Sequence, residues 1–139
     1  MRYGTRTNLK RRWTPRGHRP SGRLKIGYEY GYLYMGINPY EGEMFALLLP
    51  DMSGDSFKVY IEEFQKHIES QEQESHALIL DGARNHMQGA ITMTNLEMIK
   101  LPAYCPELNP VERFFKEIRR ELANKVFEDI QEVEKRLIR

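Results

Sequence analysis

Two acidic side chains follow the most distinctive stretches of the sequence. Asp81 comes directly after the apolar run "HALIL", and Glu112 comes directly after "LPAYCPELNPV". Carboxylates from different elements are ligands that hard cations such as Mg²⁺ or Mn²⁺ prefer. A pair of these ions can activate a water or a 3′-hydroxyl group and stabilise the leaving oxygen in phosphodiester chemistry. The two acids therefore raise the hypothesis of metal-dependent chemistry on a nucleic acid.

Each of these residues also has an ordinary structural interpretation. Asp81 precedes Gly82 and fits a turn. Glu112 follows Asn109 by one helical turn, where it could complete a capping box. His86 could shuttle a proton or contact a phosphate, because its charge changes near neutral pH, but a histidine in this place is more often an ordinary loop residue than a catalytic one. Spacing alone favours the structural interpretation of both acids.

The hydrophobic pattern predicts the strands that would position the acids. Near-alternation over 26–37 and the apolar run 44–49 predict two strands joined by a turn. The continuous apolar run 76–81 predicts a strand covered on both faces of a sheet. A further strand is predicted over 97–104, stopped by Pro102. In open α/β sheets, sites gather at the carboxyl ends of strands, where Asp81 falls.

Helical periodicity predicts the remaining elements. One helix is expected over 53–70, with Ser53 or Asp55 as its cap. A second begins at Asn109 and Pro110, which suit the cap and the first helical position. Its apolar stripe comprises Val111, Phe114, Phe115, Ile118, Leu122 and Val126.

A last short helix is predicted after Asp129. Asp129 is the expected cap, and Glu132 the expected second member of a capping box. Ile130, Val133 and Leu137 would then face inward. The predicted order is β-β-α-β-(α)-β-α-α, which indicates an α/β layer fold with a sheet flanked by helices.

The charge distribution is strongly asymmetric. Residues 1–25 carry nine Lys/Arg residues and no acid, which leaves 12 basic and all 20 acidic residues in the rest of the chain. This leader is predicted as mostly loop, with a short extended piece near Arg11–Thr14. A basic leader suggests a polyanion such as DNA as partner, and a solvated flexible segment is the alternative. The candidate stacking and phosphate contacts are Arg11, Arg12, Trp13, Arg16, His18 and Arg19.

The composition of the chain indicates the cellular compartment in which we expect it. The chain is 40% hydrophobic and 29% charged, which is typical of a soluble globular domain. Its longest apolar run, 44–50, is too short to span a bilayer. The amino terminus does not resemble a signal peptide, and the single Cys105 cannot form an internal disulfide. We therefore expect a cytoplasmic protein without a membrane partner.

Two segments together resemble a known family. "LILDGARNH" followed by "LPAYCPELNPVERFFKEIRREL" resembles the DDE-type transposases of bacterial insertion sequences related to the mariner group, and "RRWTPRGHRP" is similar to the segment that these proteins carry soon after their first catalytic acid. The resemblance covers nearly the whole chain. It implies an RNase H-like mixed sheet flanked by helices over 26–139, behind the leader at 1–25. It also implies DNA transposition by metal-dependent strand cleavage and joining.

The resemblance assigns roles by motif position. Asp81 would be the second acid of the catalytic triad and Glu112 the third, both as ligands of a two-metal Mg²⁺ or Mn²⁺ site. His86 and Asn109 would be accessory residues. Asn109 and Pro110 would fix the start of the helix whose first turn delivers the Glu112 carboxylate.

The sequence departs from the family at the first acid. The family places that Asp at the end of the first strand, a few residues before the segment matching "RYGT", where this chain has Met1. No acid occurs before Glu29. We therefore expect an incomplete metal site with weak or no catalysis, and open strand edges that could dimerise or borrow a neighbour's strand. The alternatives are a non-catalytic nucleic-acid-binding remnant of a transposase and a purely structural partner of a separate subunit.

Overall fold

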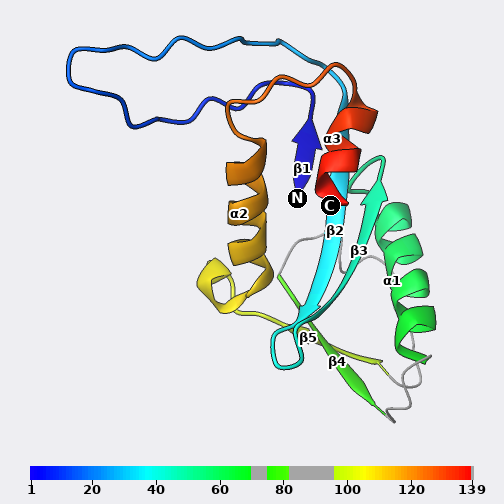
Figure 1. The fold of residues 1–139 in the computed structure, drawn as a ribbon. Helices are drawn as coiled ribbons and strands as arrows, with labels where there is room; N and C mark the ends of the chain where they lie inside the picture. The colour runs from blue at the N-terminus through cyan, green and yellow to red at the C-terminus, as the bar shows by residue number, and fades with distance from the viewer. Residues whose placement is uncertain (70–74, 82–95, 139) are drawn as a thin grey trace.

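The strands form two small sheets in the computed structural model, which describes residues 1–69, 75–81 and 96–138. The first sheet is antiparallel, with the order β1-β2-β3, and the second is a parallel pair of β4 and β5. Figure 1 shows the antiparallel sheet at the centre and the pair below it. The strands are β1 (Arg2–Gly4), β2 (Tyr30–Asn38), β3 (Glu43–Leu49), β4 (His76–Leu80) and β5 (Leu96–Lys100).

Strand β1 was not predicted. It pairs with β2 in the register Arg2↔Tyr32 to Gly4↔Tyr30, so the first residues of the leader belong to the sheet. Arg11–Thr14, for which a short extended piece is predicted, belong to no strand of either sheet. The signal for β1 is a short alternation in which Tyr3, Thr5 and Thr7 are buried and Arg2 and Arg6 are exposed. Three paired residues are too few for a clear strand pattern.

The three helices lie where the periodicity predicts them. They are α1 (Gly54–Glu69), α2 (Val111–Leu122) and α3 (Ile130–Leu137), with a 3₁₀ turn, η2 (Pro106–Leu108), ahead of α2. Ser53 caps α1, since its Oγ accepts a hydrogen bond from Ser56 N at 3.1 Å. The cap of α3 is also confirmed, because Asp129 Oδ1 accepts from Glu132 N at 2.8 Å.

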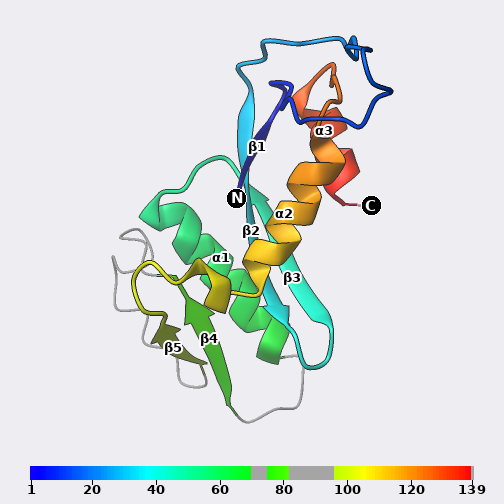
Figure 2. The same cartoon turned by 90° about the vertical axis from the view of Figure 1, so that its left-hand side faces the viewer.

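Two apolar clusters cover the two faces of the antiparallel sheet. Side chains on β2 alternate between them, with Tyr34 in the first cluster and Leu33 in the second. Helix α1 closes the first face, and α2 and α3 close the second, as the two views show (Figures 1 and 2). Ile61 and Val133 are fully buried, one in each cluster. The molecule is therefore a layered α/β/α arrangement.

Two local predictions are wrong. Strand β4 is not covered on both faces, because Leu78 is 9% exposed but Ile79 is 50% exposed. A cavity beside β4 accounts for this exposure and is described below. The apolar stripe of α2 is also shorter than predicted, since the helix ends at Leu122, before Val126, and Phe114 is 45% exposed.

Candidate active site

A cavity of about 570 Å³ lies between the two sheets. Its walls come from β2, α1, β4 and α2, so all layers of the fold contribute to it. Asp81 and Glu112 both line this cavity, although they lie far apart in the sequence. The fold therefore brings the two sequence-predicted acids to one site.

Asp81 is placed by the parallel strand pair. It directly follows β4, and the pairing with β5 continues past the strand end through a hydrogen bond from Leu101 N to Leu80 O at 2.8 Å. The carboxyl ends of parallel strands meet at one edge of a sheet, which is where open α/β folds place their sites. The Asp81 residue is exposed at that edge.

Glu112 is placed by a tightly determined helix start. Asn109 Oδ1 accepts a hydrogen bond from Val111 N at 3.2 Å, and Asn109 O accepts from Glu112 N at 3.1 Å. Pro110 occupies the N-cap with φ −62°, the value that its ring imposes. Before it, Tyr104 adopts a left-handed φ of 62°, which turns the chain from β5 toward α2. These constraints fix the first turn of α2, and with it the Glu112 backbone.

Two cations share the site with the acids. Arg119 Nη1 lies 4.0 Å from Glu112 Oε2, two turns further along the same helix face. The Met1 ammonium donates a hydrogen bond to Leu33 O at 2.6 Å and also lines the cavity. Burial lowers the pKa of this amine, as does repulsion by Arg119, while Glu112 and Asp81 oppose the shift. The charges of Arg119, Glu112 and Asp81 therefore all act on the Met1 amine.

The residues present fit a divalent metal in ligand type but not in number. Carboxylate oxygens are suitable donors for Mg²⁺ or Mn²⁺. Within residues 1–69, 75–81 and 96–138, however, no group of three His, Cys, Asp or Glu side chains comes together. Asp51 is not among the residues that line the cavity, and its Oδ1 accepts hydrogen bonds from Ser53 N at 2.8 Å and Ser56 Oγ at 2.7 Å at the start of α1.

The other predicted site residues have different outcomes. Asn109 lines the same cavity and accepts a hydrogen bond at the start of α2, while its accessory role stays a prediction. His86 lies outside the described residues. Arg119 and Met1 were missed by sequence reasoning. Arg119 could have been found from its spacing to Glu112, because residues two turns apart lie on one side of a helix; no sequence signal marks Met1.

The leader continues beyond β1 as an exposed basic arm, defined here as residues 8–24. Every residue of the arm is exposed, and Figure 1 shows it extending away from the body of the molecule. It carries six Lys/Arg residues and no acid. A turn at Pro15–His18 closes part of it, with a hydrogen bond from His18 N to Pro15 O at 3.1 Å and Gly17 at φ 87°. Trp13 is fully exposed on the arm.

The base of the arm is fixed to the body. Thr7 N donates to Lys25 O at 3.1 Å, which extends the β1–β2 hairpin outward. Asn124, at φ 58°, holds the arm to the chain just after α2: its N donates to Asn8 O at 2.8 Å, and its O accepts from Arg12 Nη2 at 3.2 Å. Arg12 is therefore partly engaged within the protein, and Arg11 and Arg16 are exposed. The predicted DNA-contact residues all lie on this arm.

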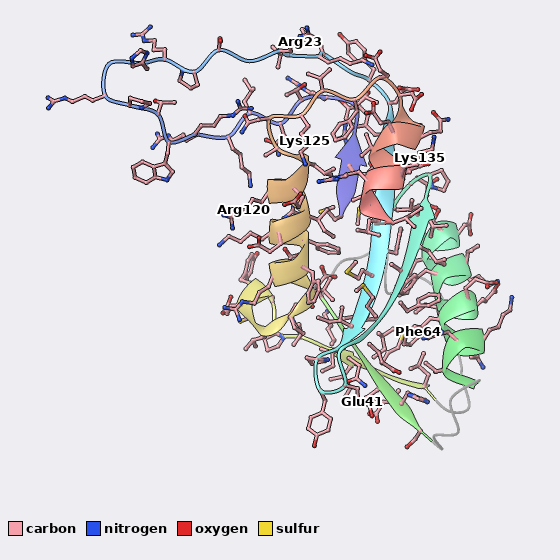
Figure 3. All side chains as sticks on the ribbon, in the orientation of Figure 1. Arg23, Glu41, Phe64, Arg120, Lys125 and Lys135 are labelled. Carbon is pink, nitrogen blue, oxygen red and sulfur yellow. The ribbon has the colours of Figure 1, made fainter. Side chains whose placement is uncertain are left out.

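The outer side of α2 is a mixed-charge surface. Figure 3 shows Arg120 pointing away from the sheet on this side. Its Nη1 lies 3.5 Å from Glu117 Oε2, and both side chains are more than half exposed. Such exposed pairs contribute little to stability. This side of α2 is therefore a solvated helix face on which opposite charges pair.

A sequence model described as "DDE superfamily endonuclease" matches residues 1–134. The chain belongs to the DDE superfamily of endonucleases. An uncharacterized protein, y4pE/y4sA of Sinorhizobium fredii (strain NBRC 101917 / NGR234), is 28% identical over 107 residues, which are 75% of this chain and 77% of the relative.

Solved structures confirm the RNase H-like fold. The "Mos1 transposase paired-end complex with left transposon end" matches with a TM-score of 0.71 and 16% identity. The Mos1 strand transfer complex gives the same values. The match covers 99% of this chain but 44% of each Mos1 chain, so the DDE endonuclease chain described here spans less than half of their length. The match extends over β1 and the arm as well as the body. Within the described residues, no helix is both long and apolar enough to cross a membrane.

Proposed function

We propose that this DDE endonuclease domain takes part in DNA transposition, and that Asp81 and Glu112 are the second and third carboxylates of its metal site. The observation that carries the proposal is that both acids line one cavity at the carboxyl end of β4. The motif positions of the two acids support it as well. By the same resemblance, the transposon belongs to the bacterial insertion sequences related to mariner.

Asp81 and Glu112 would hold Mg²⁺ or Mn²⁺ through their carboxylate oxygens. Such ions supply an activated nucleophile and stabilise a leaving oxygen in phosphodiester cleavage. Asn109 and Pro110 act by holding the first turn of α2 in place, so that the Glu112 carboxylate approaches the cavity in a fixed position. With two such carboxylates among the described residues, we expect strand cleavage by this chain alone to be weak.

DNA is the proposed partner of the arm. The titles of the two Mos1 structures name a transposon end and strand transfer. Among polyanions, DNA is therefore the one that we expect the basic residues of the arm to bind. Arginine side chains on the arm would neutralise phosphates, and Trp13 would stack on an exposed base. A homo-oligomer, formed through the open strand edges expected from the sequence, is a further proposal.

The second candidate is a nucleic-acid-binding domain without catalysis. It is favoured by the cation beside Glu112, because Arg119 Nη1 lies 4.0 Å from Glu112 Oε2 and competes with a metal ion for that carboxylate. In this case the arm binds DNA, and Glu112 serves to balance the charge of Arg119.

Binding of Mn²⁺ to the chain separates the two candidates. Electron paramagnetic resonance measures free Mn²⁺ during a titration of the wild type and of the Asp81→Asn and Glu112→Gln variants. The endonuclease proposal expects binding that each substitution weakens at least tenfold. Glu117→Gln is the matched control, because Glu117 lies on the outer side of α2 and pairs with Arg120. Binding that is equal in all four proteins would overturn the proposed metal site.

Plasmid nicking gives the second readout. Supercoiled DNA is incubated with the chain and Mg²⁺ or Mn²⁺, and open circles are counted. Weak nicking that Asp81→Asn abolishes would support a catalytic role for the acids. Strong nicking that needs Asp81 would show that the site is complete, contrary to our expectation.

A further inference from the structure

Asn124 holds the outgoing limb of the arm, residues 8–12, through three separate hydrogen bonds. Its backbone N donates to Asn8 O at 2.8 Å, and its side-chain Oδ1 accepts from Lys10 N at 3.0 Å. Its backbone O accepts from Arg12 Nη2 at 3.2 Å. The three bonds reach alternate residues of the limb. One residue of the body therefore uses both of its backbone polar groups and its side-chain carbonyl to hold the arm.

The conformation of Asn124 makes these contacts possible. Its φ of 58° lies in the left-handed region, which asparagine tolerates better than most residues with a side chain. Helix α2 has already ended at this point, since Ala123 N donates to Arg120 O at 3.2 Å and closes its last turn. The peptide groups of Asn124 therefore bond to the arm and not to the helix.

Lys25, which directly follows the arm, holds the returning chain to the same connection. Its Nζ donates to Phe127 O at 3.0 Å and also to Glu128 O. Its backbone N donates to Thr7 Oγ1 at 3.0 Å, which joins the two ends of the arm to each other. Both ends of the arm are thus fixed to residues 124–128, and Figure 1 shows the arm leaving the body beside this segment.

The rest of the arm has a different kind of order. Among the described residues, the hydrogen bonds beyond Arg12 are local to one turn, where Thr14 Oγ1 donates to His18 O at 3.0 Å and His18 N donates to Pro15 O at 3.1 Å. Trp13 is fully exposed. The contacts of the base therefore set the direction in which this outer part of the arm extends.

The connection that holds the arm continues from the helix that carries Glu112. Helix α2 has 12 residues and is therefore about 18 Å long, with Glu112 in its first turn and Asn124 just after its end. The far end of α2 is joined to α3, because Glu121 Oε2 accepts from Arg136 Nη2 at 3.2 Å and lies 3.5 Å from Lys125 Nζ. The base of the arm and the proposed metal ligand thus lie at opposite ends of one helix.

We propose that Asn124 is a positioning residue for DNA, an inference that rests on the proposed function of the arm. Asn124 restricts the arm in the free protein, so less conformational entropy is lost when DNA binds. It also fixes the direction of the arm relative to Glu112. Because Asn124 is uncharged, its contribution is separate from the neutralisation of phosphates by the arginines.

The motion of the arm can be measured in the complete chain without DNA. Trp13 is the single tryptophan of the sequence, so its fluorescence anisotropy reports on the arm. Asn124→Gly permits the left-handed φ and both backbone bonds but removes the acceptor of Lys10 N. It should lower the Trp13 anisotropy and speed amide exchange at Lys10 about tenfold, the value of a typical hydrogen bond. Asn124→Asp keeps the acceptor and should restore both readouts.

Asn38 provides a matched control. Its Oδ1 accepts from Tyr40 N at 3.1 Å in the turn between β2 and β3, so Asn38→Gly removes the same type of bond at a turn that does not contact the arm. This variant should leave the Trp13 anisotropy and the exchange of the Lys10 amide at their wild-type values.

Binding of a fluorescein-labelled DNA duplex tests the positioning role itself. Asn124→Gly should weaken the affinity about fivefold, because the loosened arm must be ordered at binding. The slope of log affinity against log salt concentration should stay the same, since the substitution removes no charge. Loss of an arginine from the arm would lower that slope instead. Asn38→Gly should bind the duplex with wild-type affinity.

Each alternative outcome is decisive. Unchanged Trp13 anisotropy in Asn124→Gly, or equal effects of Asn124→Gly and Asn124→Asp on it, would show that the side chain does not hold the arm. Wild-type DNA binding that Asn124→Gly does not weaken would overturn the positioning role alone. Absence of DNA binding by the wild type would overturn the proposed partner of the arm together with this role.

Discussion

Arg119 Nη1 lies 4.0 Å from Glu112 Oε2, so the acid proposed as a metal ligand already has a cationic neighbour on its own helix. Both side chains are about two-fifths exposed, which makes the pair weak as a source of stability. The pair matters for metal binding instead, because a divalent cation and the Arg119 guanidinium compete for the Glu112 carboxylate.

Replacing Arg119 should therefore tighten metal binding. We expect Arg119→Gln to increase Mn²⁺ affinity roughly fivefold, the factor that corresponds to about 1 kcal/mol of repulsion at this distance in water. Free Mn²⁺ measured by electron paramagnetic resonance gives the affinity. Arg120→Gln is the control, since Arg120 pairs with Glu117 on the outer side of α2. An unchanged or lower affinity in Arg119→Gln would show that Glu112 does not bind the metal.

The arm should control the salt dependence of DNA binding. Arg11→Gln combined with Arg16→Gln removes two exposed charges from the arm without removing the Arg12 contact to Asn124. The slope of log affinity against log salt concentration should fall by up to about 2 for duplex DNA. Fluorescence anisotropy at several salt concentrations measures it.

A second double variant tests whether the position of the charges matters. Lys58→Gln with Lys66→Gln removes the same charge from exposed positions on α1. We expect its slope to match the wild type. Equal losses in both double variants would mean that DNA responds to the net charge of the protein, and the arm would lose its assigned role.

Tyr3 should be a stability determinant, although it lies in the basic leader. Its hydroxyl donates to Glu134 Oε1 at 2.8 Å and so joins β1 to α3. Tyr3→Phe should lower the free energy of unfolding by about 1 to 2 kcal/mol, because a hydrogen bond to a carboxylate is lost. Urea unfolding measures the change. Tyr30→Phe, which loses a 3.2 Å bond to Gly27 O, should cost less; equal effects would contradict the special role of Tyr3.

The sequence predicts those elements whose periodic hydrophobic pattern, or whose capping residues, can be recognised locally along the chain. Helix α1, the cap of α3 at Asp129 and the strand before Asp81 are all found, because each depends on local patterns. Strand β1 was missed, since its three residues are ordered by β2 rather than by their own propensity. Long-range pairing of this kind leaves little trace in a single sequence.

The candidate site shows the same division. Motif spacing identifies Asp81 and Glu112, and the fold brings both to one cavity. Spacing could not identify the Met1 ammonium, because it reaches the site through its pairing with Leu33. Nor could it indicate that β4 pairs with β5 alone among the described residues, since an apolar run has the same pattern whether a strand has one neighbour or two. In each case the missing information concerns tertiary contacts, which join residues far apart in the sequence.

Asp51 should make the protein sensitive to acid. Hydrogen bonds from Ser53 and Ser56 lower its pKa from the ordinary value of 3.8. The folded state therefore binds fewer protons than the unfolded state near this pH, and the stability from this group is complete above pH 3.8 and lost as the pH falls through the folded pKa. Urea unfolding at a series of pH values should show this loss in the wild type and a shallower loss in Asp51→Asn. Ser56→Ala removes one of the bonds and should raise the Asp51 pKa, which an NMR titration measures directly. An Asp51 pKa that stays the same in Ser56→Ala would refute the assigned cause.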